Sequence, residues 1–219
     1  MIDPREWEGR IYVGDCLEFM RGLPDGCVDA VVTDPPYGLK FRGEQWDSEI
    51  PDWLPSAKRC APIVAFSTAP LTAWHYPCPD WVIAWHRPGS AARNLLGGLS
   101  HWSPILVYGK GSCHLPIDVI YLHAMAERFD TSHPTPKPTF VFGRVIEYLT
   151  SPGDLVLDPF LGSGTTAVVC ERLGRRWIGC EINSEYAAMA EKRVQRERDK
   201  LQLPFGAAEG SAIPQKLEV

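Results

Sequence analysis

Residues 31–40, VVTDPPYGLK, place a carboxylate close to an aromatic ring across two prolines. Proline has no N–H for a strand ladder, so the apolar run that ends at Thr33 must stop here and Asp34 must lie on a stiff turn. The Asp34 carboxylate can accept a hydrogen bond from an amino group, the carbonyl of Pro35 can accept another, and Tyr37 offers a ring face for stacking. The alternative is a plain Pro-Pro turn after a strand.

Residues 154–174, DLVLDPFLGSGTTAVVCERLG, combine a strand end, a glycine turn and a helix. Glycines let the backbone approach a ligand closely, and a helix N-terminus offers unpaired N–H groups. The next apolar run ends at Glu181, where a carboxylate can accept hydrogen bonds from two ribose hydroxyls. The turn has neither a Walker A lysine nor a G-x-G-x-x-G spacing, which favours a nucleoside with a charged tail over a triphosphate or a dinucleotide. The alternative is a tight strand–helix turn followed by an acid by chance.

Short apolar, β-branched runs alternate with helical patterns along the chain. Such runs predict strands of a mostly parallel sheet that is covered on both faces, and therefore an α/β fold. The predicted strands are 11–13, 29–33, 63–66, 81–85, 105–108, 155–157 and 177–180, and the predicted helices are 138–149, 165–173 and 184–200. Pro138 suits the first turn of its helix, and Asn183 or Ser184 can cap the last helix.

The composition is that of one ordinary globular domain. The 219 residues are 45% hydrophobic and 22% charged, and no apolar run reaches the ~18 residues that a membrane span needs. The first residues lack the basic and apolar regions of a signal peptide, and the seven cysteines are scattered without a CxxC pair, so we expect a cytoplasmic protein with reduced thiols. The histidines and cysteines at 75, 78, 113 and 114 match no zinc spacing, and no metal site is predicted.

Three motifs in this order resemble the β group of S-adenosylmethionine-dependent DNA amino-methyltransferases, which act on adenine N6 or cytosine N4. The motifs are Asp34-Pro35-Pro36-Tyr37, then residues 133–138 (HPTPKP), then residues 158–166 (DPFLGSGTT). The resemblance covers about residues 10–195. The chain departs from the family pattern at Pro136, where glutamine is usual, and at Ser103, where glutamate is frequent.

The resemblance implies a doubly wound, mostly parallel, seven-stranded methyltransferase sheet, Rossmann-like, with one antiparallel strand near an edge and a small target-recognition insertion. It implies a single domain over residues 1–200, with a catalytic half at about 10–130, a cofactor half at about 131–200 and DNA-recognition loops within about 86–130. Residues 201–219 lack a hydrophobic period, and we expect a flexible tail there. Dimers are common in the family, so a homodimer is compatible with the resemblance, whereas no feature indicates a restriction partner.

The resemblance also implies a chemistry for the first motif. The lone pair of an amino group on a base is delocalised into the ring, and accepting both amino hydrogens localises it for attack on a sulfonium methyl group. The predicted catalytic residues, acting on a base flipped out of the duplex, are Asp34, Pro35, Pro36 and Tyr37. The predicted binding residues for the cofactor, S-adenosyl-L-methionine, are Asp15, Asp34, Lys137, Asp158, Phe160, Gly162, Ser163, Gly164, Thr165, Thr166 and Glu181.

Three of the cofactor assignments have open alternatives. Asp15 can lie near the adenine ring of the cofactor, or it can cap a helix that begins near Leu17. Lys137 can pair with the methionyl carboxylate, or it can be solvated. Phe160 can pack near the adenosyl group, or it can be plain core.

Aspartate at the head of the tetrapeptide is the family's usual choice for adenine, and a carboxylate is a stronger acceptor than a serine hydroxyl. We therefore expect methylation of adenine N6, with cytosine N4 as the alternative. RNA and protein-glutamine amino-methyltransferases usually carry asparagine before the prolines and place the cofactor loop first, which disfavours them. An inactive nucleic-acid-binding module is disfavoured because both motifs are intact.

The net charge of −5 means that the cations which meet double-stranded DNA must be local. Residues 81–117 contain no Asp or Glu and carry the predicted DNA-binding residues Arg87, Arg93 and Lys110. The alternative is a buried strand pair joined by a flexible loop. A second basic segment, residues 189–200, has acids interleaved with its bases, as on a solvated helix face.

Overall fold

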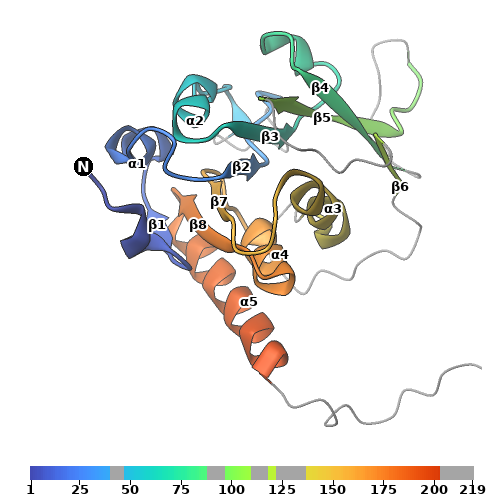
Figure 1. Cartoon of the computed structure of the whole chain (residues 1–219). Helices are drawn as coiled ribbons and strands as arrows, with labels where there is room; N and C mark the ends of the chain where they lie inside the picture. Colours follow the sequence, from blue (N-terminus) through green and yellow to red (C-terminus); the bar gives the residue numbers. More distant parts are fainter. Residues whose placement is uncertain (40–46, 88–96, 110–117, 122–136, 203–219) are drawn as a thin grey trace, which may run out of the picture.

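A single eight-stranded sheet forms the centre of the computed structural model, which describes residues 1–39, 47–87, 97–109, 118–121 and 137–202 (Figure 1). The strands are β1 (Ile11–Val13), β2 (Ala30–Thr33), β3 (Ile63–Ser67), β4 (Trp81–His86), β5 (Trp102–Tyr108), β6 (Val119–Tyr121), β7 (Leu155–Asp158) and β8 (Arg176–Glu181). Their order is β1-β8-β7-β2-β3-β5-β4-β6, and among these strands only β5 runs antiparallel to its neighbours. The predicted doubly wound, mostly parallel sheet is confirmed, with eight strands in place of seven.

Helices cover both faces of the sheet. The helices α1 (Cys16–Gly22) and α2 (Leu54–Cys60) lie on one face, and α3 (Thr139–Leu149), α4 (Thr165–Leu173) and α5 (Ser184–Gln202) lie on the other (Figure 1). Each face has its own apolar core, because short strands buried on both sides present side chains alternately to the two layers. Two single 3₁₀ turns, η1 (Pro4–Trp7) and η4 (Ala73–His75), complete the described elements.

The two helices that follow the cofactor motif begin and end as their sequences predict. Gly164 precedes α4 with φ +82° and Gly174 follows it with φ +67°, conformations that favour glycine. Asn183, one of the two predicted caps, caps α5: its Oδ1 accepts hydrogen bonds from the backbone N–H groups of Glu185 (2.8 Å) and Tyr186 (3.3 Å).

The sequence did not predict α2 or β6, and it offered α1 only as the alternative role of Asp15, a helix that begins near Leu17. The helices α1 and α2 have seven residues each, which is too short for a hydrophobic period to show. The strand β6 has three residues and pairs with the carboxyl end of β4, which accounts for the eighth strand.

No described helix is long and apolar enough to cross a membrane. The helix α5 ends at Gln202, just inside the predicted tail, and residues 203–219 lie outside the described part.

Candidate active site

The two sequence motifs meet at one point of the sheet. Strands β2 and β7 are parallel neighbours, with Val31 opposite Leu157, so the turns that follow them leave the same edge. From this point β7, β8 and β1 continue in one direction and β2 and β3 in the other, which is the topological switch where doubly wound sheets bind ligands. Thr33 Oγ1 donates a 2.5 Å hydrogen bond to Asp158 Oδ1 and ties the two turns together.

Asp158 lies beneath both turns. Its side chain is buried, and the same Oδ1 also accepts the backbone N–H of Phe160 at 3.0 Å. Burial raises the pKa of this carboxyl to about 6, against the opposing effect of its hydrogen bonds with Thr33 and Thr166. The structure therefore places Asp158 where it fixes the start of the glycine turn.

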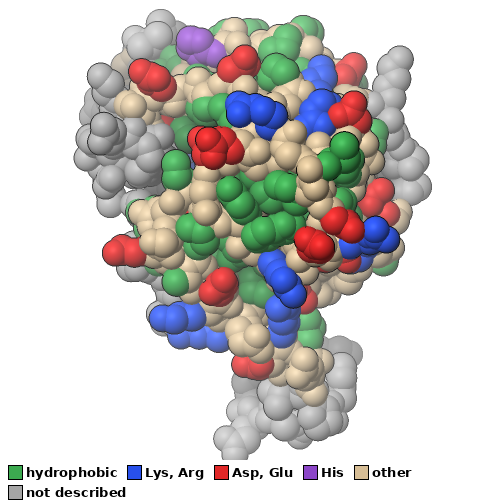
Figure 2. Space-filling view, turned by 90° about the vertical axis from the view of Figure 1, so that its left-hand side faces the viewer, with side chains coloured by type: hydrophobic (Ala, Val, Ile, Leu, Met, Phe, Trp, Pro, Cys, Tyr) green, Lys and Arg blue, Asp and Glu red, His purple; other side chains and the backbone are tan. Residues whose placement is uncertain are grey.

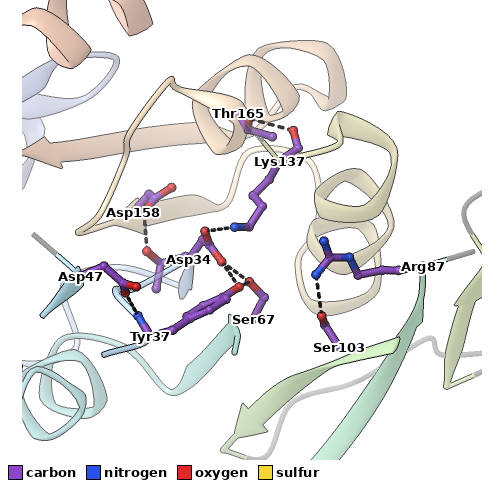
Figure 3. A network of polar contacts seen from close by, with 10 residues as sticks. Asp34, Tyr37, Asp47, Ser67, Arg87, Ser103, Lys137, Asp158 and Thr165 are labelled. Atoms are coloured by element: carbon purple, nitrogen blue, oxygen red, sulfur yellow. Dashed lines mark hydrogen bonds and ion pairs between the residues drawn. The ribbon is translucent and has the colours of Figure 1, made fainter. Parts of the chain in front are cut away.

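Asp34 is the centre of a polar network at the catalytic turn (Figure 3). Its Oδ1 accepts hydrogen bonds from the Tyr37 hydroxyl, at 2.7 Å, and from the Ser67 hydroxyl. Its Oδ2 lies 2.5 Å from the ammonium of Lys137. Burial and the neighbouring Asp34 charge raise the pKa of Tyr37 well above its usual value, so Tyr37 stays protonated and donates. Within the same motif Pro35 is buried.

Lys137 links the catalytic turn to the glycine turn. Its ammonium lies 5.2 Å from the centroid of the Tyr37 ring, and its carbonyl oxygen accepts a 3.1 Å hydrogen bond from Thr165 Oγ1 (Figure 3). The side chain is only 18% exposed. Of the two readings open from the sequence, a solvated lysine does not describe this side chain, which is paired with Asp34.

Asp47 holds the catalytic turn from behind and was not found from the sequence. Its Oδ1 accepts the backbone N–H groups of Tyr37 (2.5 Å) and Gly38 (3.0 Å), and its Oδ2 accepts that of Leu39 (3.3 Å). The residue is buried at 3% exposure. A carboxylate that receives three successive N–H groups fixes the backbone that carries the Tyr37 ring. The only sequence signal is an acid shortly after the motif, which is too common to be diagnostic.

The glycine turn is closed by Glu181 at the end of β8. Glu181 Oε2 accepts the backbone N–H of Gly162 at 2.8 Å, and Oε1 accepts that of Asn183 at 2.9 Å. Burial raises the pKa of Glu181. Gly162 has φ +52°, where a side chain would be strained, and a Cβ on Gly164 would lie 2.8 Å from Cβ of Ala190, which is too close.

The residues around the turn fit a nucleoside with a charged tail. The Glu181 carboxylate accepts backbone N–H groups and still has acceptor capacity for a hydroxyl, while the N-terminus of α4 faces the same turn. Ser163 Oγ and Arg193 Nη1 lie 2.8 Å apart, which anchors the turn to α5, and Thr165 and Thr166 are buried in the first turn of α4. These contacts give the backbone approach and the acceptors that such a ligand needs.

Two further cofactor predictions lie close to this turn with structural contacts of their own. Asp15 Oδ1 caps α1 by accepting the N–H groups of Leu17 (2.8 Å) and Glu18 (2.9 Å), so the helix-cap alternative is confirmed and is compatible with ligand binding. Phe160 packs edge-on against the buried Trp53 ring, with 5.5 Å between ring centroids. Their roles toward a cofactor stay predictions.

Arg87 is the one predicted DNA-binding residue within the described part of the chain, since Arg93 and Lys110 lie outside it. Its Nη1 donates to Ser103 Oγ at 3.1 Å, and its guanidinium lies 5.0 Å from the Trp85 ring centroid. The positive charge of Arg87 lowers the pKa of Tyr37, against the larger effect of burial, which raises it. Figure 3 shows Arg87 beside the Asp34 network. At position 103, where glutamate is frequent in the family, this chain has a serine, so the partner of Arg87 is a neutral hydroxyl.

Two basic residues of the competing segment on α5 lie in ion pairs. Arg198 Nη2 lies 2.6 Å from Glu171 Oε1, and Lys200 Nζ lies 3.7 Å from Glu197 Oε2. The face at the β1 edge, drawn in Figure 2, mixes Lys and Arg side chains with Asp and Glu ones around an apolar area. Among the described residues no group of three His, Cys, Asp or Glu side chains could hold a metal ion.

Comparisons with known proteins identify methyltransferases as relatives of this chain. A family model for N6 and N4 methyltransferases, described as DNA methylase, matches residues 102–192. The "Putative methylase YubD" of Escherichia coli (strain K12) is 30% identical over 206 residues, which cover 84% of this chain and 89% of that protein. The type II methyltransferase M2.DpnII of Streptococcus pneumoniae is 48% identical over 73 residues, 33% of this chain and 27% of that protein, so this match spans about a quarter of its length.

Solved structures show the same fold. The crystal structure of an M1.HpyAVI-SAM complex is 27% identical, with a TM-score of 0.64, covering 84% of this chain and 98% of that one. The cytosine-N4-specific PvuII DNA methyltransferase, 19% identical with a TM-score of 0.67 over 89% of this chain and 92% of its own, shares the fold. The fold and these comparisons define an amino-methyltransferase of the N6/N4 class. The chain belongs to this family of DNA methylases, and the resemblance drawn from its motifs is confirmed.

Proposed function

We propose that the protein transfers a methyl group from S-adenosyl-L-methionine to the exocyclic amino group of a base in double-stranded DNA. The observation that carries the proposal is the Asp34 carboxylate, fixed at the topological switch beside the glycine turn through the contact of Thr33 with Asp158. Family membership and the likeness to M1.HpyAVI, whose structure is of a complex with SAM, support the cofactor.

The chain's own residues position the nucleophile. Asp34 accepts one amino hydrogen and the Pro35 carbonyl accepts the other, which localises the lone pair on nitrogen. Tyr37 stacks on the flipped base, a contact worth about 1–3 kcal/mol. The bound cofactor supplies an electrophilic sulfonium methyl group, and Glu181 with the glycine turn holds its nucleoside part. Because these groups are held in place before reaction, catalysis comes from positioning and electrostatics.

We propose adenine N6 as the acceptor. The family usually pairs an aspartate at the head of the tetrapeptide with adenine, and here Asp34 is held by Lys137 and by the Tyr37 hydroxyl. Cytosine N4 is the alternative, and identification of the modified nucleoside decides between the two.

We propose that DNA meets the protein beside the catalytic turn, on the side of Arg87, with Arg93 and Lys110 contributing from segments outside the described residues. Arg87 has a neutral hydroxyl partner in Ser103, whereas Arg198 and Lys200 of α5 lie in ion pairs. A cation with a neutral partner keeps its charge available to a phosphate.

A methyl-transfer assay tests the proposal. The purified chain is incubated with tritium-labelled S-adenosylmethionine and, separately, DNA, RNA and a protein mixture. We expect label in DNA alone, and loss of the label with Asp34→Ala. Label in RNA or protein but not in DNA would replace the proposed substrate class.

A further inference from the structure

We propose that Lys137 is a two-position cation that couples cofactor binding to entry of the target base. This inference rests on the proposed function. In the first position, the one in the structure, Lys137 pairs with Asp34 and lies over the Tyr37 ring. A carboxylate tail at the glycine turn draws the ammonium away and exposes both groups to the base.

The contacts at Asp34 show why the lysine must move. Oδ1 already accepts two hydroxyl donors, from Tyr37 and Ser67, which use both of its lone pairs. A target amino group is therefore directed to Oδ2, which already accepts Lys137 at 2.5 Å and has one lone pair left. The ammonium also lies 5.2 Å from the Tyr37 ring centroid, in the space that a stacked base would take. The ammonium and a stacked base cannot occupy the same face of the Tyr37 ring at once, so the lysine must move when the base enters.

The backbone of Lys137 is fixed, whereas its side chain is long enough to place the ammonium in either of the two positions. Its backbone is held by Thr165, in the first turn of α4 beside the glycine turn, and Pro138 fixes the start of α3 directly after it. The anchor thus stays at the cofactor turn, while a flexible four-carbon stem carries a compact, mobile charge. At 18% exposure for Lys137 and 22% for Asp34, the ion pair is half-buried and can exchange for another carboxylate.

This arrangement makes the cofactor and Asp34 compete for one cation. A coupling between two sites acts equally in both directions, so weakening the Asp34 ion pair must strengthen binding of a carboxylate-bearing cofactor. The competing explanation is a fixed structural ion pair, in which Lys137 stays on Asp34 whatever is bound.

Calorimetry with two nucleosides separates these explanations. S-adenosylhomocysteine carries the amino-acid carboxylate, and 5′-methylthioadenosine lacks it. We expect Asp34→Asn to tighten S-adenosylhomocysteine binding about fivefold, to leave methylthioadenosine binding unchanged, and to have no effect on either in a Lys137→Met background. Asp52→Asn, at an exposed aspartate, is the matched control. Unchanged or weaker S-adenosylhomocysteine binding by Asp34→Asn would overturn the inference.

Entry of the target base is measured separately by fluorescence. A duplex that carries the methylated site has 2-aminopurine in place of the target base. In the wild-type protein we expect its fluorescence to rise with S-adenosylhomocysteine and not with methylthioadenosine, whereas Lys137→Met should show the rise with either nucleoside. An equal rise with both nucleosides in the wild type would contradict the two-position lysine. If labelled methyl groups never reach DNA, the proposed function fails instead, so the two failures are distinguishable.

Discussion

Thr33 and Asp158 lie 125 positions apart in the chain and are joined by a 2.5 Å hydrogen bond between Oγ1 and Oδ1. The bond connects the last residue of β2 to the last residue of β7, immediately before the catalytic turn and the glycine turn. Because both strands are buried, this contact sets the separation of the two turns more firmly than loop contacts could.

The buried Asp158 carboxyl should make stability depend on pH. Its pKa is about 6 in the folded protein, against 3.8 for an ordinary aspartate, so the folded state binds the proton more tightly. The stabilisation is complete below about pH 4 and is lost as the pH rises through 6. We expect Asp158→Asn, which keeps an acceptor oxygen, to gain up to about 3 kcal/mol of unfolding free energy over wild type between pH 4 and 7.

Urea unfolding at a series of pH values measures this difference. The exposed Asp52→Asn serves as the control for removing one negative charge. A gap between Asp158→Asn and wild type that stays constant from pH 4 to 7 would mean that Asp158 is ionised normally in the folded protein.

The catalytic turn should depend on Asp47. Replacing it with alanine leaves the N–H groups of Tyr37, Gly38 and Leu39 without their acceptor, which should cost about 2–4 kcal/mol of unfolding free energy and most of the methyl transfer. Asp47→Asn keeps acceptor capacity and should recover part of both. Denaturant titration and the tritium assay measure the two effects, with Asp52→Ala as control. Wild-type rates for Asp47→Ala would show that the turn holds its shape unaided.

Cofactor affinity should depend on Glu181. Alanine at this position removes the proposed ribose acceptor and frees the N–H of Gly162, so we expect S-adenosylhomocysteine to bind at least tenfold more weakly, about 1.4 kcal/mol. Calorimetric titration measures this, and Glu191→Ala on the exposed side of α5 is the control. If Glu181→Ala binds the nucleoside as the wild type does, the ribose is held elsewhere.

DNA binding should depend on Arg87. We expect Arg87→Ala to weaken duplex binding and to flatten its salt dependence by about one phosphate contact, while S-adenosylhomocysteine affinity is unchanged. Fluorescence anisotropy at several salt concentrations gives the slope, and the exposed Arg21→Ala is the control. A wild-type slope for Arg87→Ala would move the DNA face to other residues, with α5 as the next candidate.

The sequence predicted those parts of the site whose position follows from strand order. Asp34, Asp158 and Glu181 each close an apolar run, and parallel strands bring such ends to one edge. Asp47 and Ser67 could not be found in this way, because each acts through a contact set by how a loop folds back or which strand lies alongside. The same holds for the Lys137 contact with Asp34, since a lysine's sequence position fixes its backbone and not the carboxylate that it meets.

The most direct measurement is nucleoside mass spectrometry of DNA from a methylation-free bacterium that expresses the protein. We predict N6-methyladenine in cells with the wild-type chain and none in cells with Asp34→Ala, both chains being present at equal levels. N4-methylcytosine without methyladenine would contradict the proposed base, and unmodified DNA in the presence of folded protein that binds S-adenosylhomocysteine would contradict DNA methylation itself.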